Sequence, residues 1–309
     1  MERKILVAVE GSIYSHNAVL YLCQLFADMK DVHFDLLSLV SCSGMTAATE
    51  WLEQDELLNA LRPESRQKYR QAESVNRKYI DLFKHNGVDE KRVTSTVKAT
   101  TAPVAAEIIH FARQGLYDAL VIGRRGLSKI QELIMGSVSL QVLEKCTDVP
   151  VWIIDGAVDS HSFFVPVDGT PSSLKALDHL AFILKDHPRA EITLFNSQAF
   201  FTKNIEVDPQ VCYDHWGKEW CETHFQHPDS LFHAPRQMLV DAGFPPERIH
   251  DLQTSKGLYP SRQIVRQALM DNFGTIVMGR SEGLFKKEKY KGVTDRVVAM
   301  AVETAVWIV

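Results

Sequence analysis

The chain has 309 residues, of which 45% are hydrophobic and 24% charged, and its formal net charge is −5. This length predicts about two domains, and the hydrophobic fraction is enough for globular cores, which excludes a disordered or fibrous chain. The acidic balance disfavours nucleic acid as a partner, because nucleic-acid-binding surfaces usually carry a strong positive bias. No apolar run approaches the length of a membrane span, and the apolar stretch near the amino terminus is too short for a signal peptide.

The cysteines also indicate a compartment. There are five of them, an odd number, and they are scattered along the chain. This usage fits reduced thiols better than a disulfide framework. We therefore expect a cytoplasmic protein that does not bind a membrane.

Strands and helices alternate along the first half. Short apolar or alternating runs predict strands at residues 5–9, 32–40, 92–98, 119–122 and 149–154. Apolar residues at helical spacing predict helices at residues 16–26, 66–85, 103–112 and 138–145. Residues 41–63 show no convincing period and are expected to form a loop or an irregular helical excursion. The alternation predicts an α/β fold with a doubly wound parallel sheet.

The most informative stretch is ALVIGRRGLSKIQELIMGSVS, at residues 119–139. It predicts a buried strand, a glycine-rich turn and the start of a helix, with Ser137 at or beside the N-cap. Gly123, Gly126 and Gly136 allow main-chain N–H groups to approach a ligand beside the positive end of a helix dipole, which favours phosphate. The alternative is that these glycines serve the turn geometry alone and bind nothing.

The second half repeats the first. Residues 119–123 (ALVIG) correspond to residues 275–279 (TIVMG), and the strand-to-helix opening VAVEGS corresponds to VPVDGT. A repeat of this length is a duplicated domain and not a solenoid. We therefore expect one domain at residues 1–155 and a second at 156–309, joined by a polar linker at about 155–163.

Three features of the sequence occur together: the glycine spacing Gly-x2-Gly-x9-Gly-Ser, the strand-to-helix openings VAVEGS and VPVDGT, and the final strands VPVWIID and TAVWIV. In these features the chain resembles the tandem type of the universal stress protein family. The resemblance spans essentially the whole chain. It implies two five-stranded parallel sheets of the adenine nucleotide α-hydrolase-like, Rossmann-like kind. It also implies an internal pseudo-dimer in which the strands at 149–154 and 306–309 pair, and it leaves open whether two chains form a homodimer.

The resemblance further implies that the first domain binds ATP or a related adenine nucleotide, with or without Mg²⁺, in a stress sensor or regulator with an unknown protein partner. The contact residues that it implies are Glu10, Val40, Gly123, Arg125, Gly126, Gly136, Ser137, Val138 and Ser139. Glu10 replaces the usual aspartate, so its longer side chain reaches the ribose differently or points to solvent. Arg124 and Arg125 could add charge toward phosphate, although loop arginines are more often solvated.

The second domain keeps only part of this motif. Asp168, Gly279 and Gly292 match, whereas the alignment places Glu282 at the second glycine and Val293 at the serine. A carboxylate repels phosphate and valine lacks a hydroxyl donor, so we expect no ATP there. A loop shifted by one residue would partly restore the geometry.

Two alternatives remain. Cys212, His215, Cys221 and His224 form two pairs with the residue types of a tetrahedral zinc site, within an insertion at 197–237. The interval between the pairs is short, so we assign no metal ligand and keep a zinc-clipped interaction scaffold as an alternative. Because the chain lacks a P-loop, a Gly-x-Ser-x-Gly elbow and a His-Glu-x2-His pair, we assign no catalytic residue, although slow ATP hydrolysis is a further alternative.

Overall fold

The computed structural model describes residues 2–42, 56, 59–126, 135–158, 161–199, 209–254, 257–280 and 292–309. The chain divides into two compact units, residues 1–157 and 158–309. Within the described residues, no helix combines the length and the apolar character that crossing a membrane requires.

The first unit contains a parallel sheet with the strand order β3-β2-β1-β4-β5. Its strands are β1 (Arg3–Ala8), β2 (Val32–Ser41), β3 (Val93–Thr100), β4 (Ala119–Gly123) and β5 (Val151–Ile154). The central strand β1 pairs in parallel with both β2 and β4. The strand order reverses between β1 and β4, because the chain continues from β1 to β2 and β3 on one side and from β4 to β5 on the other. In doubly wound folds, ligands bind at the carboxyl ends of the strands at this switch point.

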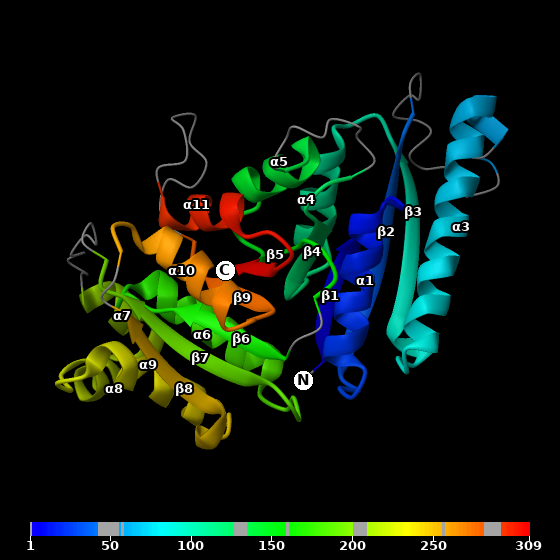
Figure 1. Cartoon of the computed structure of the whole chain (residues 1–309). Coiled ribbons are helices and arrows are strands. Elements are labelled where there is room, and N and C mark those ends of the chain that lie inside the picture. The colour runs from blue at the N-terminus through cyan, green and yellow to red at the C-terminus, as the bar shows by residue number, and fades with distance from the viewer. Residues whose placement is uncertain are drawn as a thin grey trace. The chain divides into compact units, whose positions relative to one another are not determined.

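Helices cover this sheet on both faces. They are α1 (Ile13–Phe26), α3 (Pro63–His85), α4 (Val104–Gln114) and α5 (Ser137–Lys145). Helix α3 lies along β2 and β3 (Figure 1), and it also contacts α1, whereas α4 contacts α5. Because β1 and β4 are covered on both faces, their side chains are buried almost without interruption, which explains their continuous apolar sequences.

Two helices start earlier than the sequence pattern predicted. The Ser12 side chain accepts a hydrogen bond from the Ser15 amide at 3.2 Å, so α1 begins at Ile13 and not at residue 16. Helix α3 begins at Pro63, because proline is tolerated in the first helical turn. Most of the expected irregular segment at 41–63 lies outside the described residues.

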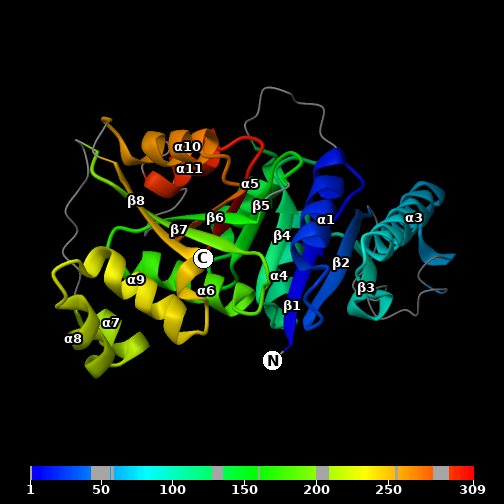
Figure 2. The same cartoon turned by 60° about the horizontal axis from the view of Figure 1, so that its bottom comes forward.

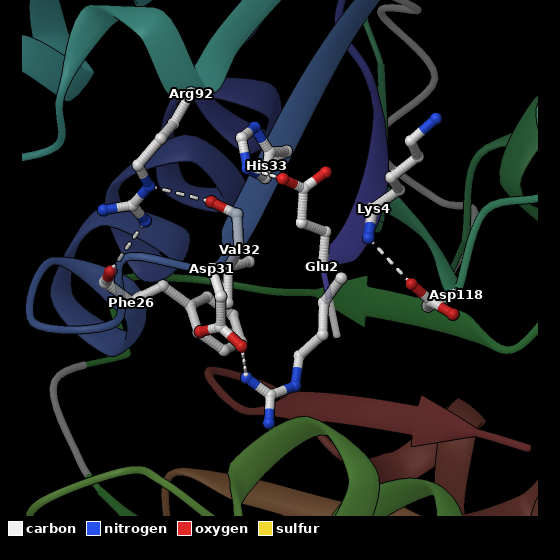
Figure 3. A network of polar contacts seen from close by, with 9 residues as sticks. Glu2, Lys4, Phe26, Asp31, Val32, His33, Arg92 and Asp118 are labelled. Atoms are coloured by element: carbon white, nitrogen blue, oxygen red, sulfur yellow. Dashed lines mark hydrogen bonds and ion pairs between the residues drawn. The ribbon is translucent and has the colours of Figure 1, made fainter.

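Polar contacts hold the opposite, amino-terminal edge of the sheet together (Figure 3). The side chain of Arg92, which is only 7% exposed, donates from Nε to the Val32 carbonyl at 2.8 Å and from Nη2 to the Phe26 carbonyl at 3.0 Å. The Lys4 amide donates to the Asp118 carboxylate at 2.7 Å. Burial lowers the pKa of the Arg92 guanidinium, so the two carbonyl contacts offset part of its desolvation.

The Arg92→Met variant should lower the free energy of unfolding by about 2–4 kcal/mol, because two buried carbonyls lose their donor. Urea denaturation would measure this change. The control is Arg77→Met, on the exposed face of α3, which should leave the free energy almost unchanged. Equal effects of the two substitutions would contradict the role of the Arg92 contacts.

The second unit has the same strand order, β8-β7-β6-β9-β10. Its strands are β6 (Ser162–Pro166), β7 (Glu191–Ser197), β8 (Ile249–Thr254), β9 (Thr275–Met278) and β10 (Ala305–Ile308). Strand β6 begins at Ser162, so the connection between the units ends before the limit of 163 that the sequence predicted. The pairing of the two final strands stays a prediction.

The helices of the second unit are α6 (Pro171–Leu184), α7 (Pro209–Trp216), α8 (Lys218–Phe225), α9 (Ser230–Asp241), α10 (Pro260–Met270) and α11 (Val293–Met300). The described part of the predicted insertion, 197–237, contains the short helices α7 and α8 and the first part of α9. Helix α8 contacts both α7 and α9, and the three lie together in Figure 2. The insertion therefore adds a small helical layer to the duplicated fold.

Candidate functional site

The glycine loop, residues 124–136, connects β4 to α5. The Gly136 amide donates to the Arg124 carbonyl at 3.0 Å, which closes the loop. A Cβ atom added at Gly136 would lie 3.3 Å from Arg125 Cα and 3.5 Å from the Gly126 nitrogen. The structure thus brings Gly126 and Gly136 together at the carboxyl end of β4.

The amino terminus of α5 has no side-chain cap and no acidic residue in its first turn. Gly136 is its N-cap, so Ser137, Val138 and Ser139 are the first three helical residues, whose amides lack carbonyl partners within the helix. The Ser139 hydroxyl donates to the Gly123 carbonyl at 2.8 Å, which leaves its amide as the group available to a ligand. This helix end therefore suits an anion.

The glycines of the loop have different tasks. A Cβ atom at Gly123 would lie 2.8 Å from Tyr14 Cβ and 2.9 Å from the Tyr14 carbonyl carbon, so glycine is required for β4 to pack against α1. At Gly126 the nearest atom to an added Cβ would be Glu10 Oε1 at 3.6 Å, which is an ordinary contact. Packing explains Gly123, whereas space for a ligand is the better explanation of Gly126.

The two loop arginines also differ, and the expectation that both are solvated is wrong for Arg124. That residue is 1% exposed and forms an ion pair with Asp155 at 3.5 Å. Burial lowers the pKa of its guanidinium. Asp155 therefore compensates the positive charge of Arg124 within the protein.

Arg125 is half-buried beside the loop. Its guanidinium carbon lies 5.9 Å from the centre of the Tyr14 ring, and its Nη1 lies 3.4 Å from the Tyr14 hydroxyl. Among the described residues its buried Nε has no hydrogen-bond partner. A fixed guanidinium with an unused donor is suited to a phosphate oxygen.

Glu10 follows β1 and extends toward the loop. Its Oε1 accepts a hydrogen bond from the hydroxyl of Ser12, the N-cap of α1. The residue as a whole is exposed, but protein atoms crowd its carboxyl, and this desolvation raises the pKa of Glu10 above its ordinary value. The structure therefore brings Glu10 and Gly126 together.

Val40 lies near the carboxyl end of β2, which is separated from β4 by β1 in the sheet. It belongs to a buried cluster with Cys42, Leu61, Tyr69 and Ala99. Its carbonyl accepts a hydrogen bond from the Cys42 thiol at 3.5 Å. A contact between its main chain and adenine stays a prediction.

The second unit treats its acidic residue differently. Asp168 accepts hydrogen bonds from the Thr170 amide at 3.0 Å and from the Thr170 hydroxyl at 2.6 Å. The carboxylate is therefore folded back onto its own turn. Gly279 is a packing residue, because an added Cβ would lie 2.0 Å from the Ser172 carbonyl oxygen.

The start of α11 matches the start of α5. Gly292 is the N-cap of α11 and Val293 its first helical residue, as Gly136 and Ser137 are in α5, so the valine takes the place of the motif serine as predicted. The Thr294 hydroxyl donates to the Gly279 carbonyl at 3.2 Å, whereas in the first unit the hydroxyl of Ser139 donates to the Gly123 carbonyl.

A carboxylate of the protein occupies the start of α11. Asp295 is 2% exposed, and its Oδ2 accepts a hydrogen bond from the Gly292 amide at 3.4 Å. Its negative charge compensates the helix dipole, whereas the first turn of α5 has no acidic residue. Glu282, the expected repulsive residue, lies outside the described residues.

The predicted zinc alternative is not supported. Cys212 and Cys221 are buried on α7 and α8, and neither forms a disulfide. Across the described residues, which include both pairs, no three His, Cys, Asp or Glu side chains are placed to hold a metal ion. His224 instead contacts His233, with Nδ1 and Nε2 3.0 Å apart.

With this geometry in view, comparison with known proteins is informative. The model of the universal stress protein family matches residues 1–155. The chain belongs to the universal stress protein family. Universal stress protein YxiE of Bacillus subtilis is 28% identical over 160 residues, which cover 50% of this chain and 99% of that protein.

Solved structures extend the likeness to both halves. A universal stress protein of Archaeoglobus fulgidus aligns with a TM-score of 0.64 and 16% identity over 99% of this chain and 97% of its own. A putative universal stress protein of Pseudomonas aeruginosa aligns with a TM-score of 0.52 and 13% identity, over 100% and 93% respectively. At these identities the likeness shows the fold alone.

Sequence reasoning missed three residues that shape this universal stress protein. They are Tyr14, Asp155 and Asp295. Tyr14 contacts the Arg125 guanidinium, Asp155 forms an ion pair with Arg124, and Asp295 lies at the start of α11 in the second unit. Each depends on contacts between segments or on a helix register that no local pattern reveals. The aromatic residue just after the Ser12 cap was the only available signal for Tyr14.

Proposed function

We propose that the first unit binds ATP or a related adenine nucleotide through its phosphates, and that the protein acts as a cytoplasmic stress sensor or regulator. The observation that carries this proposal is the uncapped amino terminus of α5 beside the adjoining Gly126 and Gly136. Helix amides and open glycine backbone supply donors to phosphate oxygens without the need for a P-loop lysine. Membership of the family supports the same ligand class.

Charged side chains around this backbone site would each contact a different part of the nucleotide. Arg125 has a buried donor directed at no other described group, and it would contact a phosphate oxygen. Glu10 lies at the same edge of the sheet, where it would face the ribose or the phosphates. The main chain of Val40 would contact the base, and Mg²⁺ would accompany the triphosphate without a dedicated protein ligand.

The second unit, in this proposal, binds no phosphate. Asp168 is engaged by Thr170, and Asp295 already compensates the start of α11. A phosphate placed there would meet a buried negative charge instead of an open helix end. The duplicated chain would therefore carry one nucleotide, as suits a sensor whose second domain serves another purpose.

Isothermal titration of the full chain with ATP and Mg²⁺ tests this function. We expect saturable binding with one nucleotide per chain. Adenosine should bind more weakly than ATP, because it lacks the groups that the α5 amides would bind. Absence of heat at millimolar ATP would overturn the proposal, and two equivalent sites would overturn the assignment of the second unit.

A further inference from the structure

The acidic residues of the two units both accept a hydrogen bond from the hydroxyl two residues later, but they differ in how far their side chains reach. Asp168 accepts two hydrogen bonds from Thr170, so its negative charge is held within its own turn. Glu10, one methylene longer, accepts a bond from the Ser12 hydroxyl and reaches the glycine loop, where Oε1 is 3.6 Å from a Cβ position at Gly126. Its carboxyl therefore borders the space in which a phosphate would bind.

A positive side chain lies near Glu10 at this edge. Arg125 lies in the neighbouring loop against Tyr14. From α3, Tyr79 bonds to the Ser15 hydroxyl at 2.9 Å, and the negative charge of Glu10 adds to the burial that raises the pKa of Tyr79. A phenol with a raised pKa stays neutral near pH 7 and provides no compensating charge.

A second titratable side chain, that of His16, needs a control in the experiment. His16 lies on α1, and its ring centre is 6.4 Å from that of Tyr79. It is half-buried. Protonation of His16 would also favour an anion at acid pH, so the test must separate it from Glu10.

We propose that Glu10 couples phosphate binding in the first unit to the uptake of a proton, so that the affinity for a polyphosphate rises as the pH falls. This inference rests on the proposed function of the same site. An ionised Glu10 and a bound phosphate repel each other across the loop, and protonation of the carboxyl removes this repulsion. A protonated carboxyl can also donate a hydrogen bond to a phosphate oxygen.

The direction of the pH effect follows from linkage. Desolvation already raises the pKa of Glu10, and a bound anion raises it further. Between the values in the free and the bound protein, binding takes up a proton and the affinity increases by up to about tenfold for each unit of falling pH. At a pH below both values the carboxyl is protonated in either state, and the dependence disappears.

The experiment measures ATP affinity by isothermal titration between pH 5.5 and 7.5, in two buffers of different ionisation enthalpy. Since the γ-phosphate of ATP also titrates there, the quantity of interest is the difference between the wild type and Glu10→Gln. We expect the wild type to gain at least about fivefold more affinity than this variant as the pH falls, with a correspondingly larger proton uptake.

Two further variants make the result specific. Glu10→Asp keeps the charge but shortens the side chain to that of Asp168, so it should lose most of the coupling. His16→Gln should retain it. Adenosine, which has no phosphate, should show no rise in affinity at acid pH.

The outcomes separate this inference from the proposed function. No ATP binding at any pH would overturn the function itself. ATP binding with the same pH dependence in the wild type and in Glu10→Gln would leave the function intact and overturn the coupling. Loss of the coupling in His16→Gln alone would assign the proton to His16 and would equally overturn the role of Glu10.

Discussion

Replacing Gly123 with alanine is expected to lower the free energy of unfolding of the first unit by about 3 kcal/mol. The added methyl would lie 2.8 Å from Tyr14 Cβ and 2.9 Å from a main-chain carbon, so β4 and α1 would have to separate. Gly279→Ala should damage the second unit at least as much, because its methyl would lie 2.0 Å from the Ser172 carbonyl oxygen. Urea unfolding would measure both losses, and hydrogen exchange would locate each in its unit.

Gly126→Ala is the matched control within the same loop. Its methyl would make only an ordinary contact with Glu10 at 3.6 Å, so stability should be nearly unchanged. The methyl would nevertheless occupy space at the proposed phosphate site, so ATP affinity should fall by about tenfold or more. Unchanged ATP affinity in this variant would mean that the glycine serves the turn alone, which is the alternative that the sequence left open.

Arg125→Ala is expected to weaken ATP binding by about 10- to 100-fold, the equivalent of one charge-assisted hydrogen bond of about 1.5–3 kcal/mol. The Arg125 guanidinium is held against Tyr14 and keeps a buried Nε without a partner among the described residues. It therefore needs little ordering when a phosphate binds. Isothermal titration with ATP and with adenosine would measure the effect.

Three comparisons give this prediction its controls. Adenosine affinity should be similar in the wild type and in Arg125→Ala, since the lost contact is to a phosphate. Arg125→Lys should recover only part of the ATP affinity. An ammonium group has neither the planar shape that stacks on the tyrosine ring nor the fixed fork of donors of a guanidinium. A fall in adenosine affinity equal to that for ATP would show that the substitution disturbs the loop instead.

Several features of this protein could be predicted because they depend on local patterns. The apolar run of β4 indicated a buried strand, and that prediction is confirmed. The predicted helix end at residue 85 is also observed, with Asn86 as the C-cap of α3 and a φ of +86° at Gly87. Periodicity and turn chemistry act over a few residues, so the sequence displays them directly.

The error at Arg124 originates in a contact between distant segments. That side chain was expected in solvent, but it pairs with Asp155 after the strand β5. No pattern within the loop itself records this partner.

The sequence by itself determined the duplicated α/β architecture, the family and the location of a glycine loop beside a helix start, since each follows from apolar periodicity, repetition and residue spacing. Only the tertiary structure decided how that loop is divided between packing and binding. It showed Gly123 against Tyr14, Glu10 against Gly126, and Asp295 at the start of α11. The contacts of Gly123 and Gly126 join segments far apart in the chain, and their distances depend on how helices pack on the sheet, which no local pattern records.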